Sequence, residues 1–202
     1  MSDTDSSQPD FWDQRWEADR LPWDLGHTPG HLEAFLQQLQ NPGRVLIPGC
    51  GSGYEVKCFH DAGHDVIAID FCESAVAHAR KVLGPLGDKV RQGDFFKHEC
   101  GETRYDFIYE RGFLCSLPPS LWQDYAARMS HLLAPGGKLF GLFLYGDEPE
   151  PPPYPLQEKT ARDILGKHFR LTNTTAVEVP SVPVYQGMEY WQQWENINGA
   201  GI

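Results

Sequence analysis

Three glycines and an aspartate stand where their residue types and spacing could hold a nucleoside. Gly49, Gly51 and Gly53 lie between a short apolar run and a helical pattern. Missing side chains let a ligand approach the backbone there, and a helix N-terminus offers free N–H donors. Asp70 follows 21 residues after Gly49, at the end of the next apolar run, where an acidic side chain of an α/β sheet binds ribose hydroxyls. The arrangement predicts a cofactor that contains a nucleoside.

The spacing of the glycines separates two cofactor classes. A dinucleotide favours G-x-G-x-x-G/A, whereas this chain has G-x-G-x-G followed by Glu55. Asp94 and Phe95 follow the third predicted strand, where a carboxylate accepts from an adenine amino group and a ring packs on the base. This combination suits S-adenosylmethionine, which carries adenosine without a pyrophosphate. A nicotinamide-dependent oxidoreductase is the disfavoured alternative.

The elements that must position these residues alternate between apolar runs and helical patterns. This alternation is typical of a mainly parallel sheet with helices on both faces. The last two β-rich stretches predict an antiparallel hairpin at the sheet edge. The predicted strands are 45–47, 66–69, 89–92, 107–109, 138–144, 170–179 and 184–194, and the predicted helices are 28–39, 54–62, 74–83, 120–133 and 158–168.

Two segments lie outside that alternation. Residues 1–10 are polar and are expected to be disordered. Residues 11–40 follow as a lid and a helix, and the lid carries Trp12, Trp16 and Trp23, three of the six tryptophans. Such a segment is expected to cover a ligand. Residues 147–155 hold five prolines and predict an extended loop.

Composition bounds the possible partners. The 202 residues fit a single domain over 1–202, and the formal net charge of −11 disfavours a phosphate backbone or an anionic membrane as partner. The apolar stretch 139–145 is far shorter than the roughly 20 residues of a membrane helix. Five cysteines without a C-x-x-C spacing predict reduced thiols and no metal site. We therefore expect a cytoplasmic protein that binds neither nucleic acid nor a membrane.

Taken together, the motifs resemble those of class I S-adenosylmethionine-dependent methyltransferases, over about 11–194. The likeness is closer to the thiopurine S-methyltransferase family, which includes bacterial thiol and selenium methyltransferases and plant halide/thiol methyltransferases. The segments that carry it are 45–51, Asp70, 93–95, 109–112 and 133–137 for the superfamily, and Phe11-Trp12, Trp16, Pro22-Trp23-Asp24, Glu110-Arg111-Gly112 and Pro152-Pro153-Tyr154 for the family.

The resemblance implies a fold and a set of site residues. The fold would be Rossmann-like and doubly wound, with a mainly parallel seven-stranded sheet, a C-terminal antiparallel hairpin and an N-terminal helical lid. Arg111 and Tyr145 would be the catalytic residues that face the methyl acceptor. The residues implied for cofactor binding are Trp12, Trp16, Trp23, Gly49, Gly51, Asp70, Phe71, Asp94, Phe95 and Glu110.

The implied activity is methyl transfer from S-adenosylmethionine to a small soft nucleophile, by a monomer. The acceptor would be a thiol or a selenium or tellurium species, which makes the chain an S-methyltransferase of the EC 2.1.1 type. Pro22-Trp23-Asp24 resembles the halide-type members, so a halide or thiocyanate methyltransferase is the alternative within the class. A non-catalytic module that binds S-adenosylmethionine is the alternative outside it.

Overall fold

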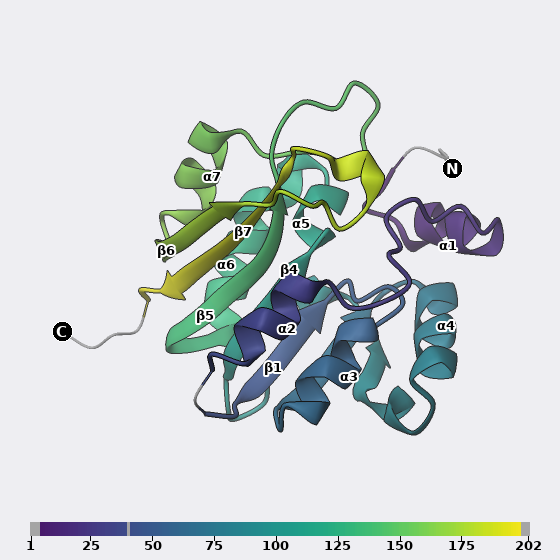
Figure 1. Ribbon diagram of the computed structural model, residues 1–202, viewed down its shortest axis with the longest axis horizontal. Coiled ribbons are helices and arrows are strands. Elements are labelled where there is room, and N and C mark those ends of the chain that lie inside the picture. The colour runs from purple at the N-terminus through teal and green to yellow at the C-terminus, as the bar shows by residue number, and fades with distance from the viewer. Residues whose placement is uncertain (1–4, 40, 199–202) are drawn as a thin grey trace. The chain divides into compact units, whose positions relative to one another are not determined.

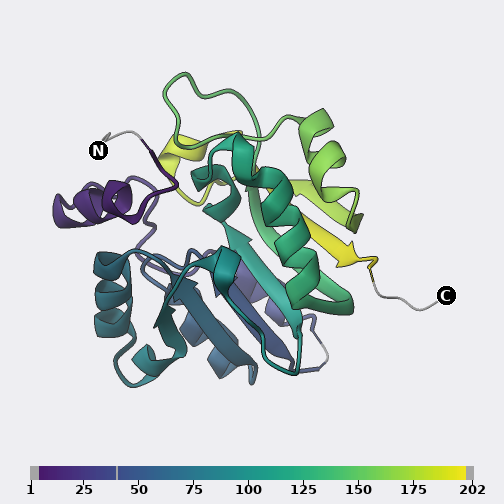
Figure 2. The same ribbon diagram turned by 180° about the vertical axis from the view of Figure 1, so that it is seen from behind.

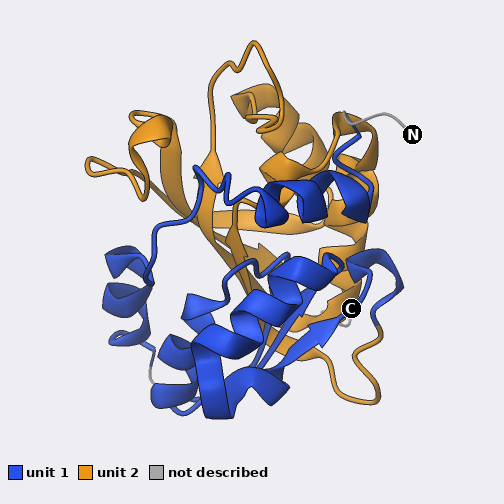
Figure 3. Ribbon diagram, turned by 90° about the vertical axis from the view of Figure 1, so that its right-hand side faces the viewer, with its two compact units in different colours: residues 1–98 blue, residues 99–202 orange. Residues whose placement is uncertain are grey.

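The computed structural model describes residues 5–39 and 41–198 (Figure 1). The chain divides into two compact units, unit 1 over Met1–His98 and unit 2 over Glu99–Ile202 (Figure 3). That the chain forms one domain stays a prediction.

Unit 1 is built on three parallel strands. They are β1 (Arg44–Pro48), β2 (Asp65–Asp70) and β3 (Val90–Gln92), with β2 paired to both of the others. Apart from the half-buried Ile67, the apolar side chains of β1 and β2 are buried, as expected for strands covered on both faces. Helices α3 (Tyr54–Asp61) and α4 (Glu73–Leu83) pack on β2, and the 3-10 helices η1 (Gly84–Lys89) and η2 (Phe95–Lys97) flank β3.

The N-terminal part of unit 1 differs from its prediction at two points. Helix α1 (Pro9–Glu17) begins inside the segment expected to be disordered, and Ser6 before it is buried. The expectation of disorder over 1–10 is therefore wrong for residues 5–10, because Pro9 suits the first turn of a helix. Residues 1–4 lie outside the described residues. Helix α2 (Gly30–Leu36) is shorter than the predicted 28–39.

Unit 2 combines one parallel and two antiparallel pairings. β4 (Tyr105–Arg111) runs parallel to β5 (Leu133–Leu144), and β7 (Glu189–Asn196) runs antiparallel to both β5 and β6 (Phe169–Ala176). The predicted C-terminal hairpin is thus confirmed. The helices are α5 (Phe113–Ser116), α6 (Trp122–Leu132) and α7 (Glu158–Leu165), with the 3-10 helices η3 (Pro119–Leu121) and η4 (Pro183–Tyr185). Helix α6 contacts β5 and α7 (Figure 2).

One glycine permits the close pairing of β4 with β5. Gly141 has a φ of +147°, and a Cβ atom placed there would lie 1.8 Å from the carbonyl oxygen of Glu110. Any side chain would push the two strands apart at the residue where β4 approaches its end.

The strand order is β3-β2-β1 within unit 1 and β4-β5-β7-β6 within unit 2. Three parallel and two antiparallel pairings confirm the predicted fold class, a mainly parallel doubly wound sheet with an antiparallel C-terminal hairpin. Within the described residues, no helix has the length and apolar character needed to cross a bilayer.

Candidate functional site

The glycine turn of unit 1 forms as the sequence predicts. It connects β1 to α3, and Gly49, Gly51 and Gly53 have φ values of +57°, +51° and +71°. Glycine is favoured in this left-handed region because it has no Cβ. The turn is closed by the Gly53 N–H, which donates to the Cys50 carbonyl at 2.9 Å, so α3 can begin at Tyr54.

Asp70 ties the end of β2 to this turn. Its carboxylate accepts from the Gly51 N–H through Oδ2 and from the Cys72 N–H through Oδ1, each at 3.0 Å. The residue is only 8% exposed, and burial raises the pKa of its carboxyl to about 6. A carboxylate has about four lone-pair sites, so two N–H donors leave capacity for hydroxyl donors of a ligand.

The tryptophan segment is attached to the same turn. The Cζ2 atom of Trp16 lies 3.7 Å from the place where a Cβ on Gly51 would stand, so the indole lies over the turn. The hydroxyl of Ser52, within the turn, donates to the Asp24 carboxylate. On the same segment, Asp13 accepts from the Ser74 N–H at 2.9 Å and from the Cys72 thiol at 3.0 Å. The lid is therefore held by its carboxylates as well as by its rings.

The other two tryptophans of the segment contact each other. The rings of Trp12 and Trp23 meet edge to face, 5.4 Å apart, and the Trp12 indole N–H donates to the Ser6 carbonyl at 2.8 Å. Trp16 instead has its ring 5.1 Å from that of His78 on α4. Sequence reasoning missed His78, because a single histidine on a helix carries no motif.

The two predicted site residues after β3, Asp94 and Phe95, differ in exposure. Asp94 accepts from the Phe96 N–H at 2.9 Å and pairs with Lys97 at 3.0 Å, and its side chain is partly exposed. Phe95 is 4% exposed, while Phe96 is half-buried. The aromatic residue with an accessible face is thus Phe96, which sequence reasoning missed. Phe71, which follows Asp70, is also half-buried.

Glu110 is the most heavily engaged carboxylate of unit 2. It is 1% exposed and accepts from the N–H groups of Phe113 at 2.8 Å and Leu114 at 3.0 Å and from the Tyr125 hydroxyl at 2.6 Å. Burial raises the pKa of its carboxyl to about 7, although these three donors oppose the shift. In unit 2, Glu110 therefore holds the start of α5 against α6. Its expected role toward the cofactor stays a prediction.

Arg111, next along β4, lies near two weak acids that sequence reasoning did not single out, the buried Cys115 and the half-buried Tyr185. Burial raises the pKa values of Tyr185 and Cys115, and the positive charge of Arg111 opposes both shifts. The loop that carries Tyr185 is fixed by Glu189, which accepts from the Ser181 N–H at 2.5 Å and from its hydroxyl at 2.6 Å. No sequence signal marks Tyr185, because the β6–β7 connection has no motif.

Tyr145 follows β5 and is half-buried. Its hydroxyl donates to the side-chain oxygen of Gln192 at 3.2 Å, and its ring lies 5.2 Å from that of Tyr190. Burial raises the pKa of this phenol. In the same unit, the N–H of Tyr154 in the proline-rich loop donates to the Cys115 carbonyl at 2.6 Å. Tyr145 and Tyr154 are therefore both held by contacts within unit 2.

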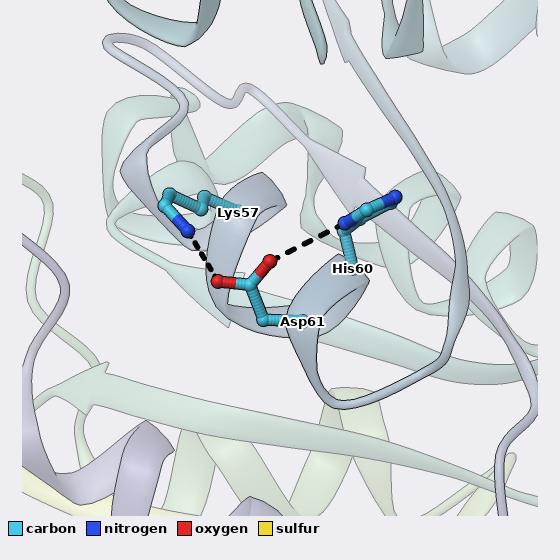
Figure 4. A network of polar contacts seen from close by, with 3 residues as sticks. All are labelled: Lys57, His60 and Asp61. Carbon is cyan, nitrogen blue, oxygen red and sulfur yellow. Dashed lines mark hydrogen bonds and ion pairs between the residues drawn. The ribbon is translucent and has the colours of Figure 1, made fainter.

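Within unit 1, helix α3 carries an exposed polar cluster. Asp61 pairs with Lys57 and with His60 Nδ1, the latter at 3.4 Å, and all three side chains are exposed (Figure 4). In the part of the chain that the structure describes, no group of three histidine, cysteine or acidic side chains could hold a metal ion.

A solved structure identifies the fold. A solved structure of 1,6-didemethyltoxoflavin-N1-methyltransferase from Burkholderia thailandensis, with S-adenosylhomocysteine bound, matches with a TM-score of 0.76 and 22% identity, covering 94% of this chain and 87% of that one. The chain thus has the fold of class I S-adenosylmethionine-dependent methyltransferases.

Sequence comparison then gives the family. Residues 7–195 match the thiopurine S-methyltransferase family, and the chain belongs to it. A probable thiol methyltransferase 2 of Arabidopsis thaliana is 32% identical over 76% of this chain and 70% of the relative. Thiocyanate methyltransferase 1 of the same plant is 28% identical over 93% of this chain and 85% of the relative. The chain is an S-methyltransferase that uses S-adenosylmethionine.

Proposed function

We propose that unit 1 supplies the cofactor site. The hydrogen-bonding groups of unit 1 fit this cofactor. Glycines with positive φ let a ligand approach the backbone of the turn, and the Asp70 carboxylate can still accept hydrogen bonds from ribose hydroxyls. Asp94 lies at the end of the next strand. The Trp16 indole over Gly51 supports a contact with the positively charged sulfonium. The other proposed contacts are Trp12, Trp23, Gly49, Phe71 and Phe95, to which we add Phe96 because its ring is accessible.

The acceptor that the geometry favours is a small thiol, or a selenium or tellurium species of similar softness. The observation that carries this is the engagement of Glu110, whose carboxylate is used by three donors. It is therefore not free to act as a general base. When bound, S-adenosylmethionine supplies a methyl group already activated on a sulfonium, so a soft nucleophile needs alignment and exclusion of water more than a base.

The chain's own contribution would then be orientation and charge. Arg111 would orient the acceptor and stabilise its thiolate, because a nearby positive charge lowers a thiol's pKa. Tyr145 would border the acceptor. S-adenosylmethionine would supply the methyl group and leave as S-adenosylhomocysteine, and the thiol proton would pass to water. Glu110 would support this arrangement by fixing the start of α5 beside Arg111.

Halide or thiocyanate methylation is the second candidate. It is favoured by the similarity to thiocyanate methyltransferase 1 and by Pro22-Trp23-Asp24. Within unit 1, however, Asp24 accepts from the Ser52 hydroxyl and from the Gly26 N–H. Asp24, which is part of the halide-type pattern, therefore attaches the N-terminal segment to the glycine turn.

A turnover screen with methyl-labelled S-adenosylmethionine tests the proposal. Thiols, selenite, halides, thiocyanate and small phenols are supplied as acceptors, and labelled product is quantified for each. We expect the highest kcat/KM with a thiol or a selenium species. Labelled product from halides or thiocyanate alone would favour the second candidate, and none from any acceptor would favour a binding module.

We further propose that the protein is a cytoplasmic monomer. It would bind neither nucleic acid nor an anionic membrane, because a net charge of −11 disfavours such surfaces.

A further inference from the structure

The first turn of α4, all of it within the described residues, receives no capping hydrogen bond from its own N-cap side chain. That N-cap residue is Cys72, whose φ of −75° and ψ of 120° are the extended values of an ordinary N-cap. Serine, threonine, aspartate or asparagine at this position accepts from the second or third N–H of the helix, whereas a thiol is only a weak acceptor. The start of α4 therefore depends on an acceptor from another element.

Asp13 on α1 supplies that acceptor. Its Oδ1 atom accepts from the Ser74 N–H at 2.9 Å, and Ser74 is the second residue of α4. The same oxygen accepts from the Cys72 thiol at 3.0 Å. Burial would raise the pKa of the Asp13 carboxyl, but hydrogen bonds from Cys72 and from the start of α4 together lower it. A charged carboxylate is thus held at the positive end of the α4 dipole.

The capped turn follows directly after the proposed ribose ligand. Cys72 donates its thiol to Asp13 and its backbone N–H to the Asp70 carboxylate, at 3.0 Å in each case. A single residue therefore links the lid helix to the carboxylate at the end of β2. A change in the first turn of α4 that moves Cys72 also moves a hydrogen-bond donor of Asp70.

A second contact fixes how α1 lies on α4. Trp16, three residues after Asp13, has its ring 5.1 Å from that of His78, which is four residues after Ser74. Residues three or four apart lie on one face of a helix, so each helix presents both of its contact residues to the other. The Asp13 contact therefore also helps to set where the Trp16 indole lies over the glycine turn.

We propose that Asp13 is a positioning residue that caps α4 from the lid and thereby holds Asp70 in place for the cofactor ribose. Closure of the lid and completion of the ribose site are then one event. A lid that only covered the bound cofactor would not need a carboxylate at the start of α4. This inference rests on the proposed function, in which Asp70 binds the ribose.

Hydrogen exchange of the ligand-free protein tests the capping half of the proposal. Asp13→Ala removes the acceptor of the Ser74 N–H, so we expect amides in the first turn of α4 to exchange about three- to tenfold faster. Asp13→Asn keeps an acceptor oxygen, so its exchange should stay within about twofold of the unaltered chain. Glu17→Ala removes the same charge from an exposed position of α1 and is the control. An unchanged rate in Asp13→Ala would overturn the proposal.

Replacement of Cys72 by serine tests the positioning half, because a serine at the N-cap can itself accept from the Ser74 N–H. Calorimetric titration of S-adenosylhomocysteine should give a Kd about three- to tenfold higher for Asp13→Ala. Adding Cys72→Ser to Asp13→Ala should return the Kd to within about twofold of that of Cys72→Ser alone. If the lid acted only as a cover, the double variant would stay as weak as Asp13→Ala, and that result would overturn the proposal.

A double variant with Asp70 separates this inference from the proposed function. If Asp13 acts through Asp70, Asp13→Ala should cause no further loss of affinity once Asp70→Ala is present. Fully additive losses would overturn the inference while leaving the cofactor site standing. Unchanged affinity in Asp70→Ala would overturn the proposed ribose contact, and the positioning role of Asp13 with it.

Discussion

The two units place their functional carboxylates in opposite ways. In unit 1, carboxylates join segments far apart in the chain: Asp70 reaches Gly51, Asp24 reaches Ser52, and Asp13 reaches Ser74, which is 61 residues away. In unit 2, Glu110 reaches donors three, four and fifteen residues ahead. The first arrangement attaches a lid to a binding turn. The second builds a rigid local frame beside Arg111.

This contrast predicts different consequences for removing a carboxylate. Removing the Asp70 carboxylate should mainly weaken cofactor binding, and removing the Glu110 carboxylate should mainly lower the free energy of unfolding. The predictions below test that division.

The largest effect is expected for Glu110→Ala. Three donors, two of them in buried hydrogen bonds, would lose their acceptor, and leaving a buried donor unsatisfied costs about 1–3 kcal/mol, with partial relief by water. We expect the free energy of unfolding, measured with urea, to fall by about 3 kcal/mol. Glu102→Ala, at an exposed position of the same unit, is the control and should stay within about 0.5 kcal/mol. Full stability of Glu110→Ala with lost S-adenosylhomocysteine binding would move Glu110 to the cofactor site.

The pH dependence of stability sharpens the same point. Burial raises the pKa of Glu110 from 4.5 to about 7, so between these values the folded state holds a proton that the unfolded chain has lost. Its contribution to stability is complete below about pH 4.5 and is lost as the pH rises through 7. Asp70, with a pKa of about 6, acts in the same direction. We expect the free energy of unfolding to fall from pH 4.5 to 7.5 more steeply in the unaltered chain than in Glu110→Gln. Identical slopes would contradict the assignment.

A smaller effect is expected at the lid. Asp24→Ala and Ser52→Ala each remove the same contact, so each should raise the rate of tryptic cleavage within residues 15–20 by about fivefold, equivalent to about 1 kcal/mol. Asp24→Ala also removes the acceptor of the Gly26 N–H, so the double variant should be cleaved no faster than Asp24→Ala alone. Additive increases would mean that the two residues act separately. S-adenosylhomocysteine should protect the unaltered segment, which tests the predicted ordering of the lid over bound cofactor.

The smallest effect is expected on the exposed face of α3. Lys57 and Asp61 form an ion pair there (Figure 4), and such pairs contribute little because solvent screens them. Lys57→Ala should leave both the unfolding midpoint and methyl transfer unchanged. A clear loss of activity would show that this surface takes part in function.

The sequence predicts unit 1 well because its residue types mark where the strands end. Gly49, Gly51 and Asp70 belong to elements whose apolar runs and turn residues mark them plainly. Phe95 shows the limit of that approach: two adjacent phenylalanines look alike in the sequence, and only the turn of η2 decides that Phe95 is buried and Phe96 accessible.

Unit 2 is harder to predict from the sequence, because loops and the register between strands bring its polar side chains together. The pairing of β5 with β7 and of β6 with β7 brings Gln192 near Tyr145 and Thr174, and no motif announces that register. Tyr185 and Tyr125 are likewise placed by packing. The sequence shows that Glu110 is a carboxylate at the end of a strand, but its three hydrogen-bond donors are set by the positions of α5 and α6.

The division of labour between the units is tested most directly by calorimetric titration of S-adenosylhomocysteine into two variants. Asp70→Ala should weaken binding about five- to a hundredfold, with Asp70→Asn nearer the unaltered chain because it keeps an acceptor oxygen. Arg111→Ala should bind within about twofold of the unaltered chain while its thiol turnover falls about ten- to a hundredfold. Unchanged affinity in Asp70→Ala, or abolished affinity in Arg111→Ala, would contradict the account.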